Sequence, residues 1–136
     1  MKQFWINLPV KDVQRSIEFF EKIGFQNSPM HQDSSHLARF FLGEKNVVMM
    51  LFPEEAFESF TAHKVSDTAA GSEILLNIDA ESREEVDAMA ERVREAGGRI
   101  YAEPGESQGW MYAFGFIDPD GHRWSMLHMD MTKMPG

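Results

Sequence analysis

The same order of predicted elements occurs twice along this chain, and that repetition restricts the possible folds more than any other feature. Alternating apolar residues predict a strand over residues 3–10 (QFWINLPV) and another over residues 72–80 (SEILLNIDA). Each of these strands precedes a helical pattern, and each helical pattern precedes three further strand-like or extended segments. The sequence therefore predicts a repeat of about sixty residues with the order βαβββ in each copy.

In the first copy, Asp12 is a good N-cap for a helix that Gly24 ends. Residues 24–35 contain Pro and many polar side chains, and they predict an edge strand or a loop. The apolar runs at residues 36–43 (HLARFFLG) and 46–52 (NVVMMLF) are separated by a short Gly-containing turn. These two runs predict a β-hairpin.

In the second copy, Ser82 and Glu85 form the capping-box pattern that opens a helix, and Gly97 closes that helix. The pattern predicts three strands after it, at residues 99–104 (RIYAEP), 109–118 (GWMYAFGFID) and 122–129 (HRWSMLHM). The whole chain is expected to be one α+β domain. Its expected parts are a first module at 1–52, a linker at 53–71, a second module at 72–130 and a tail at 131–136.

The charge balance argues against two classes of partner. The 136 residues include 13 Lys and Arg against 22 Asp and Glu, a formal net charge of −9, which opposes binding to nucleic acid or to an anionic membrane. There is no Cys, so a disulfide framework or a thiolate site is excluded. No signal-peptide pattern and no apolar run near 18 residues is found, so a cytoplasmic location is expected.

Three motifs, in this order, resemble the vicinal oxygen chelate superfamily of glyoxalase I, bleomycin-resistance proteins, fosfomycin-modifying enzymes and extradiol dioxygenases. The motifs are INLPVKDVQRSIEFFEKIGF from residue 6, ILLNIDAESREEVDAMAERVREAGGRI from residue 74 and FGFIDPDGHRWSML from residue 114. The resemblance implies tandem βαβββ modules that form curved mixed sheets around a cleft. It also implies a homodimer.

Active members of that superfamily usually hold a divalent metal ion with four side chains, from the first and last strand of each module. The resemblance places these positions at Trp5, at Met50 (or Met49 with a slip of one residue), at Glu73 and at Ser125. Indole is not a metal ligand, and a thioether is too soft for the ions that such sites use. Only Glu73 is a good ligand, so we expect no metal cofactor.

Alternation along the strands separates two faces. Apolar residues expected to pack on helices are Ile6, Leu8, Ile74, Leu76, Ile78, Trp124 and Met126. The other face is expected to line a pocket, with candidate ligand-binding residues Trp5, Asn7, Met50, Phe52, Leu75, Met111, Arg123 and Ser125. Within residues 110–116, one face carries the rings of Trp110, Tyr112, Phe114 and Phe116, and the other carries Met111, Ala113 and Gly115. The small side leaves room for a ligand if the ring side packs on a helix. For Trp5 and Met50, simple packing is an alternative to ligand contact.

Glu73 has two possible roles that the sequence leaves open. It is a candidate catalytic acid or base with a pKa raised by burial, or it pairs with Arg123 and is neutralised. The DPDG segment at residues 118–121 predicts a turn whose carboxylates stay in solvent or cap backbone N–H groups, rather than a cation site. The histidines His31, His36, His63, His122 and His128 are scattered, which favours surface positions.

Two classes of function fit these observations. The first is metal-independent binding of a small aromatic or amphipathic molecule in the cleft between the modules. The second is a metal-dependent lyase or dioxygenase of the glyoxalase I or extradiol type that uses Glu73. A plain interaction module without a cavity is a third possibility.

Overall fold

The computed structural model describes residues 1–28 and 35–135, and the elements follow the predicted βαβββ order in each half of the chain. The elements are β1 (Trp5–Val10), α1 (Val13–Lys22), β2 (Gln26–Asn27), β3 (Ala38–Leu42), β4 (Val47–Pro53), α2 (Glu54–Thr61), β5 (Leu75–Asp79), α3 (Arg83–Glu95), β6 (Arg99–Ser107), β7 (Met111–Ile117), β8 (Arg123–Met129) and the 3-10 helix η2 (Met131–Lys133). The chain divides into two compact units, Met1–Ala70 and Gly71–Gly136. The predicted α+β fold of tandem βαβββ modules is confirmed.

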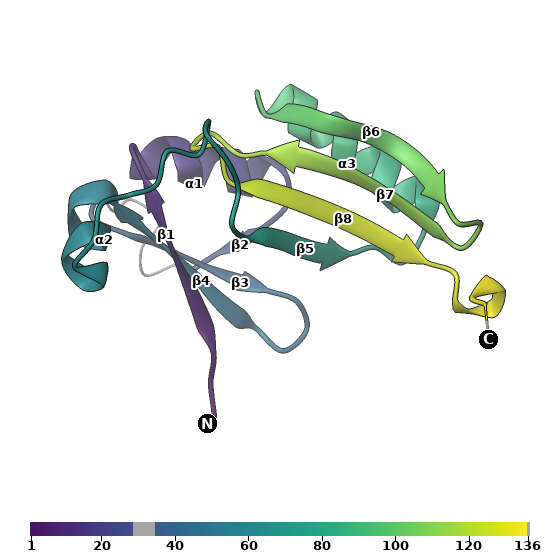
Figure 1. Cartoon of the computed structure of the whole chain (residues 1–136), viewed down its shortest axis with the longest axis horizontal. Helices are drawn as coiled ribbons and strands as arrows, with labels where there is room; N and C mark the ends of the chain where they lie inside the picture. The colour runs from purple at the N-terminus through teal and green to yellow at the C-terminus, as the bar shows by residue number, and fades with distance from the viewer. Residues whose placement is uncertain (29–34, 136) are drawn as a thin grey trace. The chain divides into compact units, whose positions relative to one another are not determined.

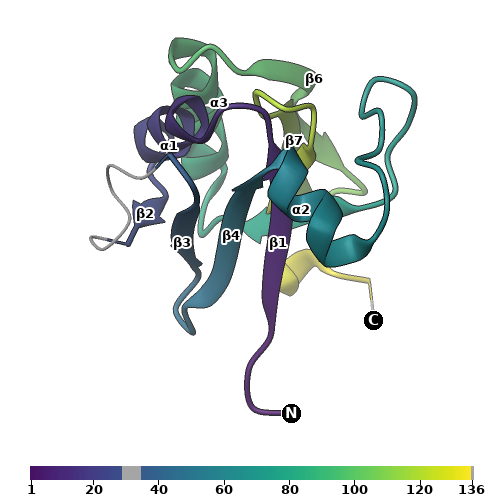
Figure 2. The same ribbon diagram turned by 90° about the vertical axis from the view of Figure 1, so that its left-hand side faces the viewer.

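Sheet 1 belongs to the first unit and has the strand order β1-β4-β3-β2, as Figure 2 shows. Strand β4 pairs in parallel with β1 and antiparallel with β3, so the sheet is mixed. Gly43 and Asn46, with φ of 73° and 52°, turn the chain between β3 and β4 as the predicted hairpin. The expected edge strand is the two-residue β2.

Helix α1 packs on one face of sheet 1 and forms the core of the first unit. Its N-cap is Asp12, as predicted, and the carboxylate Oδ1 accepts a hydrogen bond from the backbone N–H of Arg15 at 3.1 Å. The buried side of α1 includes Ile17 and Phe20, and the Phe20 ring lies 5.6 Å from the ring of Phe40 on β3. Full burial of each such side chain contributes about 1.5–3 kcal/mol to folding.

Sheet 2 belongs to the second unit and repeats the same topology, in the order β5-β8-β7-β6. Helix α3 lies along β6, β7 and β8 (Figure 1). The capping box is present, because Ser82 Oγ accepts from the Glu85 N–H at 3.1 Å, while the Glu85 carboxylate accepts from the Glu81 N–H at 2.7 Å. The predicted start of this helix is therefore confirmed.

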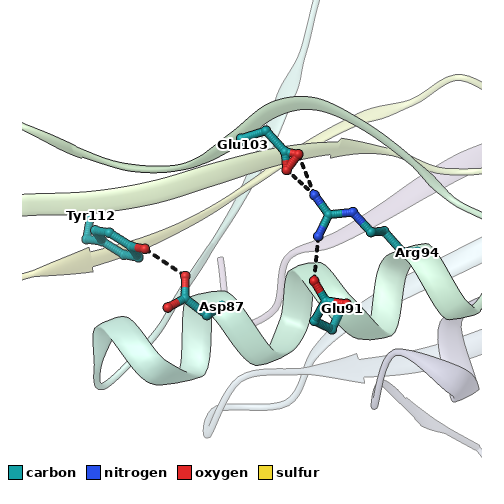
Figure 3. Close-up of polar contacts among 5 residues, drawn as sticks. All are labelled: Asp87, Glu91, Arg94, Glu103 and Tyr112. Carbon is teal, nitrogen blue, oxygen red and sulfur yellow. Dashed lines mark hydrogen bonds and ion pairs between the residues drawn. The ribbon is translucent and has the colours of Figure 1, made fainter.

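Polar contacts also fasten α3 to the sheet beside it (Figure 3). The Tyr112 hydroxyl on β7 donates to Asp87 Oδ1 on α3 at 2.7 Å, and this bond raises the pKa of the phenol. Arg94 on α3 forms ion pairs with Glu91 one turn earlier and with Glu103 on β6. These contacts join the helix to two different strands.

The start of β5 differs from the prediction. The strand begins at Leu75 rather than at residue 72, and Ile74 is 64% exposed, so its assignment to the helix-packed face was wrong. The reason is the register: Leu75 pairs with Arg123, so earlier residues would have to pair with the turn that precedes β8. The residues of that turn, 118–122, are not part of a strand, so β5 cannot pair with them.

The segment predicted as a linker contains the helix α2. This helix follows β4 directly, with Pro53 at its N-cap. Two acidic residues in its first turn, Glu54 and Glu55, stabilise the helix because they lie near the positive end of its dipole. At the other end of the chain, η2 is capped by Asp130, whose carboxylate accepts from the backbone N–H of Thr132 at 3.1 Å. Met131 and Met134 are exposed there.

Candidate functional site

The strand register separates the two faces of sheet 1. Residues that are Cα partners on neighbouring strands point to the same side, so Met49 joins Ile6 on the face packed by α1, and Met50 joins Asn7 on the opposite face. Met49 is fully buried. The alternative that placed Met49 at the family's ligand position is therefore wrong. We call the side with Asn7 and Met50 the Trp5 face.

The Trp5 face carries rings, a thioether and a few polar groups. Across three strands, one row consists of Asn7, Met50 and Arg39, and the next row consists of Trp5, Val48 and Phe41. Trp5 is 52% exposed, which leaves half of a large aromatic surface uncovered. The predicted residues Trp5, Asn7 and Met50 thus share one face.

Phe52 lies at the end of the same face and already has an aromatic neighbour. Its ring meets the ring of Phe60 on α2 edge to face, with centroids 4.9 Å apart and an interplanar angle of 81°. Because α2 follows β4 without a loop, the helix folds back beside β1 and β4 (Figure 2). Phe52 is therefore partly a packing residue of α2.

Arg39 is a residue of the Trp5 face that the sequence analysis missed. It stands on β3 between the buried residues Ala38 and Phe40, and its guanidinium carbon lies 5.1 Å from the centroid of the Phe41 ring. Its buried Nε has no hydrogen-bond partner among the described residues. Alternation in HLARFFLG was the signal that could have identified it.

The opposite face of sheet 2 from α3, which we call the Ser125 face, holds the predicted residues of the second module. Asn77, Ser125 and Gly115 form one row across β5, β8 and β7, and Leu75 stands beside Arg123 in the next row. Met111 is on the same face at the far end of β7, opposite Met129. As predicted, Trp124 and Met126 are buried on the α3 side.

Tyr101 covers the Ser125 face at Gly115, and the sequence analysis missed it as well. Its side chain lies across Gly115, so that a Cβ at Gly115 would come within 2.5 Å of the phenol oxygen. The Tyr101 hydroxyl donates to the carbonyl oxygen of Trp124 at 3.1 Å. The expectation that the small residues of β7 leave this place open for a ligand was wrong at Gly115.

The position of Glu73 bears on the two roles predicted for it, a buried acid or base and an ion pair with Arg123. It lies on a bend two residues before β5 and is exposed. In the described part of the chain no ion pair joins it to Arg123, whose guanidinium carbon instead lies 4.7 Å from the centroid of the Tyr101 ring. Neither burial nor pairing distinguishes Glu73 from other surface carboxylates.

The DPDG segment forms a turn stabilised by its own first carboxylate. Asp118 is 4% exposed, and its Oδ1 accepts from the backbone N–H groups of Asp120 and His122, both at 3.0 Å. Its Oδ2 accepts from the Trp124 indole N–H at 3.1 Å. Burial raises the pKa of Asp118. The prediction of a capping role is confirmed for this carboxylate.

The residues present do not fit the divalent metal ion that the fold implies. An indole, a thioether, one exposed carboxylate and a hydroxyl stand at Trp5, Met50, Glu73 and Ser125. This donor set has no imidazole and a single carboxylate, whereas such ions are held by several of these groups together. Residues 1–28 and 35–135 contain no cluster of three or more His, Cys, Asp or Glu side chains with metal-binding geometry.

The histidines do not alter this conclusion about donor groups. His36 and His63 are exposed, and His122 and His128 are partly buried. The His128 Nδ1 lies 3.0 Å from the carbonyl oxygen of Ala80, which occupies one ring nitrogen. His31 lies outside the described residues. Within the described residues, no helix is long and apolar enough to cross a membrane.

Comparison with solved structures shows the same fold in many proteins. A hypothetical protein from S. aureus matches with a TM-score of 0.82 and 26% identity, over 94% of each chain. A lactoylglutathione lyase from Agrobacterium tumefaciens matches with a TM-score of 0.68 and 16% identity, also over 94% of each chain. A genomically encoded fosfomycin resistance protein from Listeria monocytogenes matches with a TM-score of 0.68 and 19% identity, over 93% of this chain and 90% of that one.

Comparison with curated proteins finds no match. A family model, in contrast, matches nearly the whole chain, over residues 2–126. Its description is the Glyoxalase/Bleomycin resistance protein/Dioxygenase superfamily. This match agrees with the repeated βαβββ topology of the two sheets. The chain therefore belongs to the glyoxalase/bleomycin resistance protein/dioxygenase superfamily.

Proposed function

We propose that the protein binds a small aromatic or amphipathic molecule without a metal ion, on the Trp5 face of sheet 1. The observation that carries this proposal is the composition of the Trp5 face. Trp5, Phe41 and Met50 lie in adjoining rows of one sheet face, and half of the indole surface is exposed. Stacking a ligand ring on that indole would remove apolar surface from water on both partners.

The donor groups support binding rather than Lewis-acid chemistry. A metal-dependent lyase or dioxygenase needs an ion held by several side chains so that it can polarise a substrate or bind dioxygen. Trp5, Met50 and Ser125 cannot supply such a set, and Glu73 alone is one carboxylate on an exposed bend. Binding on a ring-lined face needs none of these ligands.

A ligand screen on metal-free protein tests the proposal. Protein treated with a chelator is screened by thermal shift against small aromatics, thiol conjugates and glycopeptide drugs, and the affinities of hits are measured by calorimetry. Trp5→Ala is expected to weaken hits by on the order of 1–3 kcal/mol, because the stacked ring is lost. Phe4→Ala is the matched control, since Phe4 is also exposed but precedes β1.

Two results would contradict the proposal. If hits bind Trp5→Ala as tightly as the wild type, the ligand does not use the Trp5 face. If a hit is converted to product and Glu73→Gln abolishes that turnover, the protein is an enzyme of the lyase or dioxygenase type and Glu73 is its acid or base.

A further inference from the structure

We propose that Arg39 binds a carboxylate group of the ligand, so that the ligands of this protein are aromatic carboxylates. This inference rests on the proposed function, because it assigns a partner to the ring-binding site on the Trp5 face. It begins from the place of Arg39 in sheet 1. Arg39, Met50 and Asn7 are Cα partners on three neighbouring strands, and Phe41 is two residues further along β3.

The guanidinium of Arg39 differs from those of Arg83 and Arg94 in its charge partners. Arg83 is paired with Glu106, and Arg94 is paired with Glu91 and Glu103. Across the described ranges, 1–28 and 35–135, no carboxylate forms an ion pair with Arg39, although the chain has 22 Asp and Glu residues. The Phe41 ring covers one side of the cation, and no carboxylate within the described ranges neutralises it.

The hydrogen bonding of the Arg39 guanidinium indicates which chemical group of a ligand would bind it. A buried N–H without an acceptor is unfavourable, and no atom of the described chain accepts from this one. Because the Nε is itself covered, a carboxylate would reach the guanidinium at its two Nη groups, whose parallel N–H bonds match its two oxygens in a bidentate pair. A neutral amide offers only one such oxygen and no charge.

The position of Arg39 also sets the shape of the ligand. Arg39 on β3 and Trp5 on β1 are separated by β4, and two strand spacings amount to about 10 Å. A ring stacked on Trp5 and a carboxylate at Arg39 can belong to one molecule if a short linker joins them. An arylalkanoate has this form, and Met50 between the two strands would contact the linker.

The test compares two probes that differ in one group, 3-(2-naphthyl)propanoate and its carboxamide. Calorimetry measures both on wild type, Arg39→Gln, Arg39→Lys and Trp5→Ala. On wild type, the carboxylate is expected to bind roughly tenfold or more tightly than the amide. Arg39→Gln is expected to remove this preference while leaving the amide affinity within about twofold, and Arg39→Lys is expected to retain part of it because the charge remains.

Control variants separate Arg39 from other cations. Arg99→Gln removes one positive charge from an exposed site on β6 and is expected to leave the preference intact. Arg123→Gln tests the cation of the Ser125 face; if it abolishes the preference and Arg39→Gln does not, the inference is overturned. The thermal midpoint of each variant shows that the comparison is made on folded protein.

The two proposals fail in different ways. If both probes bind equally on wild type and Trp5→Ala weakens both, the ring site stands and the role of Arg39 is refuted. If neither probe binds wild type at millimolar concentration, the ring site for arylalkanoates and the role of Arg39 are both refuted.

Discussion

Replacing Gly115 by Ala should destabilise the protein, and the cost should depend entirely on Tyr101. Gly115 has no positive φ that would disfavour Ala, and the nearest atoms to an added Cβ all belong to the Tyr101 ring. The methyl group would displace the ring and break the hydrogen bond to the Trp124 carbonyl and the contact with Arg123. These losses are worth about 0.5–1.5 kcal/mol for the hydrogen bond and about 0.5–1 kcal/mol for the cation–π contact.

Ala is itself the better strand residue, by roughly 0.5–1 kcal/mol, because Gly loses more backbone entropy on folding. Subtracting this gain from the combined loss of about 1–2.5 kcal/mol leaves a net cost of about 0–2 kcal/mol in the wild type, with a central value near 1 kcal/mol. In a Tyr101→Ala background the same substitution has no ring to displace, and it should stabilise by about 0.5–1 kcal/mol. The sign of the effect is expected to reverse between the two backgrounds.

Urea unfolding followed by far-ultraviolet circular dichroism measures the four members of this double-mutant cycle. The coupling free energy between positions 101 and 115 is expected to be about 1–2.5 kcal/mol. Equal costs of Gly115→Ala in both backgrounds would refute the reasoning, since they would mean that Tyr101 does not lie over Gly115 in solution.

Three further predictions concern the turn, the metal ion and the assembly. Asp118→Asn places an amide NH₂ against the indole N–H of Trp124 and should cost about 1–3 kcal/mol in urea unfolding. Because burial raises the pKa of Asp118 in the folded state, that carboxyl contributes less stability as the pH rises from the ordinary Asp pKa through the raised one, so the cost should shrink over that window. Dialysis against Zn²⁺, Ni²⁺, Mn²⁺ or Fe²⁺ should leave no stoichiometric metal, and one ion per chain that is lost in Glu73→Ala would contradict the donor argument. Sedimentation should detect a homodimer, and a monomer at all micromolar concentrations would refute that expectation.

Local signals in the sequence predicted most of the fold correctly. Asp12 and Ser82 cap helices because their side chains satisfy N–H groups that the first helical turn cannot. Alternation placed Trp124 and Met126 on the buried face of β8, because side chains on a strand point to opposite sides in turn. These features depend on residues within one turn or one strand, and a single sequence contains that information.

The site was harder to predict because its residues depend on pairing between distant segments. Tyr101 stands at a register shift between Ile100 and Ala102 in β6, so the residue of β7 that it covers depends on this irregular pairing rather than on alternation alone. Pro104, which lacks an N–H, lies in the second irregular stretch of the same edge strand. The exposed position of Glu73 likewise follows from the register of β5 with β8 rather than from its own neighbours.

The two sheets share one topology but differ at equivalent positions, and this difference bears on where a ligand ring binds. In strand order, the row Asn7, Met50 and Arg39 of sheet 1 corresponds to the row of Asn77, Ser125 and Gly115 in sheet 2.

Where sheet 1 has a guanidinium, sheet 2 has no side chain, and Tyr101 from the neighbouring strand fills the space and is held there by the carbonyl oxygen of Trp124. An aromatic ring thus already covers the Ser125 face at Gly115, whereas on the Trp5 face half of the Trp5 surface is exposed. A ligand ring gains more by covering exposed indole than by displacing a hydrogen-bonded phenol. The repeat therefore builds the same topology twice. Under the proposed function, the difference between Arg39 and Gly115, which pair with the last strand of their modules, is the reason to expect the ligand ring on the Trp5 face.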